Sequence, residues 1–175
     1  DYLIGHKEVE PFFVVTVQWA PSIGRETSYL MNRLFARFFV EELIPYIDST
    51  YTTLPTREGR AIVGESSAGL GAVYLAWEKP DYFKWAIGQS GYYSYNGDAL
   101  MDSISAASTY DLHFYLEVGT YETAVGGGIS LLAAQQRLAD VLEAKGYDFV
   151  ELYVPDGHSW GNWQRTLPDA IRWMW

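Results

Sequence analysis

The sequence predicts an α/β fold in which a mostly parallel sheet is flanked by helices. Two observations lead to this prediction. Short apolar runs alternate along the chain with longer segments of helical periodicity, as they do in βαβ units. Short polar segments follow three of these runs, and ligands of parallel sheets bind beyond the carboxyl ends of the strands.

The apolar runs are the candidate strands. The first, Phe12–Val17, is rich in β-branched and aromatic residues, is too short for a helix and precedes Pro21 and Gly24, so we expect a buried strand there. Similar runs farther along the chain predict four more strands, over residues 61–64, 85–88, 112–118 and 149–154.

The segments between the runs are the candidate helices. Between Leu30 and Ile47, apolar residues recur at i, i+4 and i+8 in two neighbouring rows, which predicts an amphipathic helix with a kink or stop at Pro45. Further helices are expected over 70–77, 99–107, 129–145 and 160–175, the last interrupted by Pro168. Gly146 is expected to end the helix before it.

Size and composition predict one domain over residues 1–175 and exclude several classes of function. The chain is 49% hydrophobic and 17% aromatic, which is enough apolar surface for a packed core. Its formal net charge is -10 and its 12 Lys and Arg residues are scattered, which excludes nucleic-acid binding and a polybasic membrane patch. No apolar run approaches the ~18 residues that span a bilayer.

The chain contains no cysteine, which excludes disulfides, thiolate metal sites and a cysteine nucleophile. No signal peptide is visible from Asp1 onward. We expect a secreted or periplasmic protein, with a cytoplasmic one as the alternative.

Residues Gly64 to Gly69 lie between a predicted strand and a predicted helix, which is the context of a nucleophile elbow around Ser66. The elbow turn is strained and needs small neighbours, although Ala68 replaces the glycine of the common Gly-x-Ser-x-Gly pattern. The turn would place the Ser67 backbone N–H at a helix N-terminus, where it can stabilise an oxyanion. The alternative is that Ser66 only caps the helix.

His158 is the candidate general base. It follows the last predicted strand on a loop that can reach a nucleophile, and Trp160 can pack over its ring. His6 lies near the N-terminus and His113 lies inside a predicted strand, so neither is expected to act in catalysis. The alternative is that His158 is a solvated loop residue.

Glu122 is the candidate acid because it follows the fourth predicted strand and could accept a hydrogen bond from the histidine. Asp156 is the rival, since it is close to His158 in sequence, but Glu122 emerges from its own strand end. An ordinary exposed glutamate is the alternative to both. The order Ser66, Glu122, His158 is that of the α/β-hydrolase triad, and each member follows a predicted strand.

At these residues the chain resembles the esterase D-like family of α/β-hydrolases, which includes feruloyl, acetyl xylan and enterochelin-type esterases and S-formylglutathione hydrolases. The resemblance implies an α/β-hydrolase-type fold and the triad Ser66, Glu122 and His158, although the family often has Asp at the acid. It is carried by segments that span most of the chain, namely 42–47, 64–71, 79–83, 89–91, 117–122 and 157–160 with Trp163.

The chain departs from this family at its beginning. Family members usually have strands before the segment that starts near Asp1, and a loop after one of them supplies the second oxyanion N–H. The chain is therefore expected to lack the N-terminal strands of the full fold. Either the chain is a fragment, or a partner or a rearranged strand completes the sheet, or Gln18 and Trp19 supply the missing donor.

Together these features predict a carboxylic ester hydrolase that forms an acyl-enzyme and needs no metal or organic cofactor. The expected partner is a small-molecule or carbohydrate-linked ester, with feruloyl or acetyl xylan esters first, and a homo-oligomer is left open. Trp19, Trp160 and Trp163 are candidate substrate-binding residues, with core packing as the alternative. The alternative functions are an acyltransferase, a siderophore or thioester hydrolase, and a non-catalytic carbohydrate-binding or scaffold domain.

Overall fold

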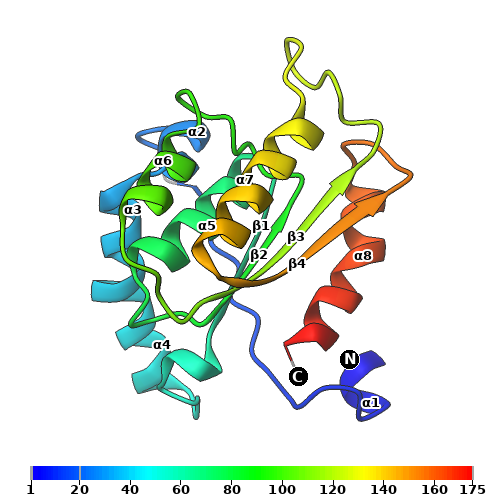
Figure 1. Ribbon diagram of the computed structural model, residues 1–175. Helices are drawn as coiled ribbons and strands as arrows, with labels where there is room; N and C mark the ends of the chain where they lie inside the picture. Colours follow the sequence, from blue (N-terminus) through cyan, green and yellow to red (C-terminus); the bar gives the residue numbers. More distant parts are fainter. Residues whose placement is uncertain (1, 20, 175) are drawn as a thin grey trace.

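A four-stranded, fully parallel sheet forms the centre of the structure (Figure 1). The computed structural model describes residues 2–19 and 21–174. The strands are hydrogen-bonded in chain order and comprise β1 (Ala61–Glu65), β2 (Trp85–Gln89), β3 (His113–Gly119) and β4 (Asp148–Val154). The carboxyl ends of all four strands therefore lie along one edge, and the predicted parallel sheet is confirmed.

Helices cover both faces of this sheet (Figure 1). One face carries α5 (Ser67–Glu78) over β1 and β2 and α7 (Leu131–Lys145) over β3 and β4, with α6 (Ala99–Ala106) against α7. The other face carries α8 (Trp160–Trp173) against β3. The remaining helices are α1 (Tyr2–Gly5), α2 (Arg25–Tyr29), α3 (Arg33–Phe38) and α4 (Ile44–Thr50).

The core is divided by the sheet into two clusters. The larger cluster takes alternate residues of β2 and β3 and packs them against α5, α6 and α7. The intervening residues Ile87 and Tyr115 point to the opposite face, where they contact Ala170 and Trp173 of α8. Burial on both faces is typical of parallel strands and explains their continuous apolar runs. The contacts of Ile87 and Tyr115 with α8 also hold the N-terminus of this helix at the carboxyl edge of the sheet.

The segment 12–17 is extended but forms no strand, so its prediction as a buried strand is wrong. Phe13, Val14 and Val15 are exposed, and within the described residues the segment pairs with no strand. Preference for the β conformation reflects packing on a pleated, half-buried surface, and such a surface exists only where a neighbouring strand pairs.

The predicted helix over 30–47 begins later and continues farther. Asn32 caps α3, because its side-chain oxygen accepts from the N–H groups of Leu34 and Phe35. A π-helical turn over Phe39–Leu43 then joins α3 to α4. Pro45 lies directly after this turn and does not stop the helix, since the widened turn relieves the clash and the lost hydrogen bond that proline imposes.

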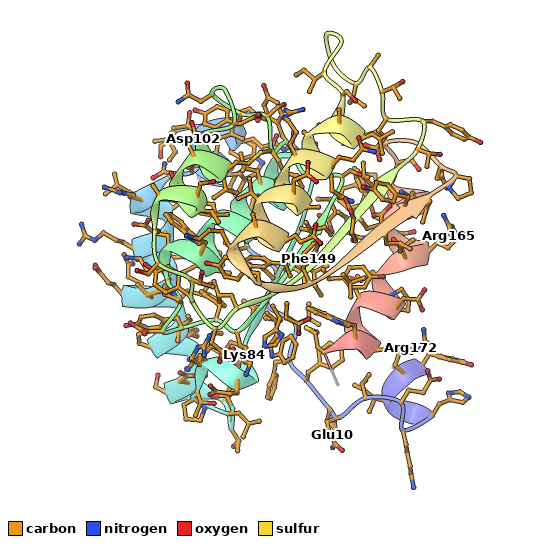
Figure 2. All side chains as sticks on the ribbon, viewed as in Figure 1. Glu10, Lys84, Asp102, Phe149, Arg165 and Arg172 are labelled. Carbon is orange, nitrogen blue, oxygen red and sulfur yellow. The ribbon has the colours of Figure 1, made fainter. Side chains whose placement is uncertain are left out.

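The other predicted helices are confirmed within the described residues, and residue 175, at the end of the predicted helix 160–175, lies outside them. Gly146 ends α7 in the left-handed conformation at φ 72°. Pro168 lies inside α8 without interrupting it, so that detail of the prediction is wrong. The packing of Ala170 and Trp173 holds the turn beyond the proline. Arg172 also lies 2.5 Å from a carboxylate oxygen of Glu8, and Figure 2 shows it at the end of α8 nearest α1.

No helix in residues 2–19 and 21–174 is both long enough and apolar enough to cross a membrane.

Candidate active site

Ser66 occupies a strained turn between β1 and α5. Its backbone has φ 59° and ψ −124°, a combination that costs energy for a residue with a side chain. Two hydrogen bonds to the segment at the end of β2 hold the turn. The Ser66 N–H donates to the carbonyl oxygen of Gln89 at 2.9 Å, and the Ser66 carbonyl accepts from the N–H of Tyr92 at 3.1 Å.

The glycines of the elbow are required by close backbone approach. A Cβ atom on Gly64 would lie 2.1 Å from the carbonyl oxygen of Ala68, and one on Gly69 would lie 3.0 Å from the Cα of Gly91. Small residues at these positions therefore let α5 start directly above β1, which leaves the Ser66 side chain at the carboxyl edge of the sheet.

The structure brings the three predicted triad residues together. The His158 Nε2 atom lies 3.0 Å from the Ser66 Oγ atom, and the His158 Nδ1 atom lies 2.6 Å from the Glu122 Oε2 atom. Glu122 is fully buried, whereas Ser66 and His158 are partly exposed. One continuous hydrogen-bonded path thus joins an accessible hydroxyl to a buried carboxylate through an imidazole.

The loops that carry Glu122 and His158 are fastened to each other. The N–H of Thr120 donates to the Val154 carbonyl at 2.7 Å, and the N–H of Tyr121 donates to the Asp156 carbonyl at 3.1 Å. The rival acid, Asp156, accepts instead from the N–H of Gly157 at 2.8 Å. Its side chain therefore shapes the loop of His158, and the carboxylate at the imidazole is that of Glu122.

The second oxygen of Glu122 is held by groups that sequence reasoning missed. It accepts from the Ser90 hydroxyl at 2.6 Å and from the Gly119 N–H at 2.8 Å. The Ser90 hydroxyl oxygen in turn accepts from the Trp163 indole N–H at 2.8 Å. Ser90 is fully buried and has a left-handed φ of 50°. The only sequence signal was the segment 89–91 at the end of a predicted strand.

The candidate substrate-binding tryptophans lie in different surroundings. Trp163 is only 6% exposed and packs edge-on against the His158 ring at 4.9 Å, so it offers little surface to a substrate. Trp160 is 65% exposed and packs against Trp163 at 5.1 Å, so most of its side chain is accessible. Trp19 is half-buried and makes no hydrogen bond or ring contact with the triad in the part of the chain that the structure describes.

A second buried carboxylate lies behind the triad. Glu117 of β3 accepts from the Asn162 side-chain amide of α8 at 2.8 Å. The Gln89 amide nitrogen lies 3.3 Å from the other Glu117 oxygen and donates to the Thr166 hydroxyl at 2.7 Å. Burial raises the pKa of the Glu117 carboxyl above its ordinary value. This network ties α8 to the sheet close to where the loop of His158 ends.

One backbone N–H group, that of Ser67, lies where an oxyanion donor is expected. Ser67 is the first residue of α5, so its N–H is one of the first-turn donors that have no partner within the helix. Within the described residues, neither Gln18 nor Trp19 makes a hydrogen bond with the triad, and their role as second donor stays a prediction. No group of three or more His, Asp or Glu side chains among these residues is arranged to hold a metal ion.

The chain resembles known proteins both in sequence and in fold. The chain is 26% identical over 186 residues to the uncharacterized protein YjcH of Bacillus subtilis (strain 168), covering 99% of this chain and 75% of that protein. The enterobactin esterase of Shigella flexneri superposes with a TM-score of 0.85 at 21% identity, over 99% of this chain and 47% of that one. A ferulic acid esterase superposes with a TM-score of 0.69 at 18% identity, over 80% and 60% of the two chains.

The chain therefore spans about half the length of the first solved structures that it resembles. At these identities the likeness establishes the fold, and the predicted α/β-hydrolase-type fold is confirmed. The family model described as "Putative esterase" matches residues 14–174, which is nearly the whole chain and includes all three members of the Ser-His-Glu arrangement. The chain belongs to the Putative esterase family.

Proposed function

We propose that this chain hydrolyses carboxylic esters, with Ser66 as nucleophile, His158 as general base and Glu122 as the acid that orients the imidazole. The observation that carries the proposal is the hydrogen-bonded path of 3.0 Å and 2.6 Å from the Ser66 hydroxyl through His158 to Glu122. Membership of an esterase family supports the same reaction.

In the first step, His158 Nε2 takes the Ser66 proton while Ser66 Oγ forms a bond to the ester carbonyl carbon. The carbonyl oxygen becomes an oxyanion near the start of α5, where the Ser67 N–H can donate to it. The C–O bond then breaks, and the alcohol leaves with the proton from His158. Water attacks the acyl-enzyme in the same way, which returns the carboxylic acid and the Ser66 hydroxyl.

Glu122 stabilises the imidazolium that forms in both steps. Because its two oxygens have different partners, the carboxylate cannot rotate without losing the bonds from Ser90 and Gly119. His158 therefore keeps Nδ1 toward Glu122 and Nε2 toward the nucleophile, which is the tautomer that general-base catalysis requires.

We propose carbohydrate-linked esters, feruloyl or acetyl xylan esters first, as the substrates. The similarity in fold to a ferulic acid esterase supports this choice. Trp160, which is exposed and packs on the Trp163 ring that contacts His158, supplies an aromatic surface on which a sugar or phenolic ring can lie.

The test is turnover of p-nitrophenyl acetate by Ser66→Ala. We expect kcat to fall by about 10⁴-fold or more, because the nucleophile is lost while its surroundings persist. Ser105→Ala is the matched control, since Ser105 is an exposed serine on α6 whose hydroxyl, among the residues described, bonds only to the backbone of its own helix. Equal turnover by Ser66→Ala and Ser105→Ala would refute the proposal.

A further inference from the structure

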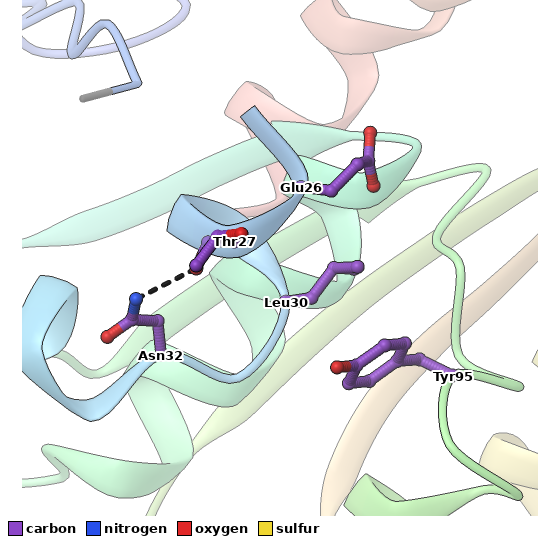
Figure 3. Close-up of a pocket in the computed structure, with 5 residues that line it drawn as sticks. All are labelled: Glu26, Thr27, Leu30, Asn32 and Tyr95. Atoms are coloured by element: carbon purple, nitrogen blue, oxygen red, sulfur yellow. Dashed lines mark hydrogen bonds between the residues drawn. The ribbon is translucent and has the colours of Figure 1, made fainter. Parts of the chain in front are cut away.

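An open cavity of about 330 Å³ lies beside the elbow, apart from the tryptophans considered above. Figure 3 shows its lining, in which Tyr95 projects from its own loop while the other side chains come from α2 and the turn that follows. The lining residues are Glu26, Thr27, Leu30, Asn32 and Tyr95.

Both walls of this cavity are joined to the elbow. The Ser67 hydroxyl donates to the Glu26 Oε2 atom at 2.7 Å, which attaches α2 to the residue after the nucleophile. On the other wall, the N–H of Tyr92 donates to the Ser66 carbonyl at 3.1 Å, and the Tyr92 ring packs on that of Tyr95 at 6.0 Å. The walls of the cavity are therefore in contact with Ser67 on one side and, through Tyr92, with the Ser66 backbone on the other.

Of the lining residues, Asn32 has a structural role, and the other four are available to bind a ligand. The Asn32 amide is committed to the backbone, because its nitrogen donates to the Thr27 carbonyl and its oxygen caps α3 (Figure 3). The other lining residues are Glu26, which carries a carboxylate, Thr27 and Tyr95, which carry hydroxyls, and Leu30, which is apolar.

This lining selects by charge and by hydroxyl content. A carboxylate accepts hydrogen bonds and repels anions, and none of the five lining residues is basic. Arg25 lies 3.2 Å from the other Glu26 oxygen, but both side chains are half exposed, so the pair is weak and leaves the carboxylate accessible. The tyrosine ring and the leucine add an apolar surface for the face of a ring.

We propose that this cavity is a subsite for an uncharged, hydroxyl-rich ring, a single sugar unit of the substrate, and that Glu26 discriminates against anionic substrates there. The volume agrees with one ring, since ligand pockets range from about 300 to 1,000 Å³. The inference rests on the proposed function and adds to it the sign of charge that the site accepts.

The experiment compares methyl 2-O-acetyl-xylopyranoside, which is uncharged, with the corresponding acetylated methyl glucuronoside, which adds a carboxylate at C5. The unaltered chain should have the higher kcat/KM on the xyloside. Glu26→Gln should reduce this preference by about tenfold, because the amide removes the charge but keeps an oxygen that can accept from Ser67. Glu41→Gln is the control, since Glu41 pairs with Arg37 on the exposed surface of the helical region and should leave the ratio as it is.

A second variant tests the ring contact. Tyr95→Ala should lower kcat/KM on the xyloside relative to that on p-nitrophenyl acetate by about tenfold, and Tyr95→Phe should restore most of it. The inference is overturned if Glu26→Gln shows the same charge preference as Glu41→Gln, or if an active chain hydrolyses neither sugar ester. These outcomes are distinct from failure of the proposed function, which would show as undiminished turnover by Ser66→Ala.

Discussion

At the scale of single residues, the orientation of Glu122 depends on Ser90. The Ser90 hydroxyl donates to Glu122 and accepts from the Trp163 indole, all within a fully buried environment. Its left-handed backbone places this hydroxyl under the carboxylate, and the Ser90 N–H bonds to the Glu117 carbonyl at 2.6 Å. Backbone strain of this kind persists only where neighbouring bonds maintain it.

We therefore predict that Ser90→Ala lowers kcat on p-nitrophenyl acetate by about 10- to 100-fold with little change in KM. The reason is that the Glu122 Oε1 atom loses one of its two hydrogen-bond donors, and the Trp163 indole N–H loses its acceptor. Ser90→Gly should lose a similar factor, although it removes the strain of the positive φ. Steady-state kinetics of the two variants beside their unfolding midpoints checks this. Activity within twofold of the unaltered chain in both variants would show that Ser90 has no positioning role.

The proximity of Ser66, Glu122 and His158 could be predicted from the sequence, because the topology of the sheet brings their positions together. In a parallel sheet, residues that follow β1, β3 and β4 meet at one edge, whatever their separation along the chain. Ser90 could not be identified in this way. Its role depends on a turn conformation and on the indole of Trp163, which is 73 residues away, and the residues around Ser90 in the sequence indicate neither of these.

At the scale of elements, the sequence correctly predicted the strands and helices whose apolar residues pack against one another in the core. The four confirmed strands and the helices between them bury their apolar residues against each other. The segment 12–17 has an equally strong pattern, but a pattern does not state whether a partner strand exists. Pro45 was expected to kink or stop a helix and Pro168 to interrupt one. Both helices continue past these residues, with a π-helical turn before Pro45 and packing against the sheet beyond Pro168.

The placement of α8 depends on the buried carboxyl of Glu117. Burial raises the pKa of this carboxyl, so the folded chain retains a proton at pH values where the unfolded chain releases it. The folded state then binds more protons than the unfolded state. It follows that this group's contribution to the free energy of unfolding falls as the pH rises from the ordinary glutamate pKa of about 4.3 to the raised value.

We predict that Glu117→Gln removes this component of the pH dependence. The difference in free energy of unfolding between the unaltered chain and Glu117→Gln should fall with rising pH, by about 1.4 kcal/mol for each unit by which the folded pKa is raised. Urea unfolding at several pH values between 4 and 8 measures it, with the exposed Glu143→Gln as control. Parallel curves for the unaltered chain and Glu117→Gln would contradict the assignment.

At the scale of the whole molecule, fold and chemistry rest on different evidence. The match to the enterobactin esterase covers 99% of this chain at only 21% identity, so the shared architecture is maintained by packing rather than by particular residues. The reaction that we propose depends instead on a few side chains at one edge of the sheet. This chain covers 47% of that neighbour, so the reaction has to be tested on the chain itself.

The most direct test is labelling with a fluorophosphonate probe, followed by mass spectrometry of the intact chain and of its peptides. An activated serine reacts with such a probe, whereas an ordinary hydroxyl does not. We predict one adduct per chain on the peptide that contains Ser66, absent in Ser66→Ala, strongly reduced in His158→Ala and retained in Ser105→Ala. An adduct on another residue, or equal labelling of the unaltered chain and His158→Ala, would contradict an imidazole-activated Ser66.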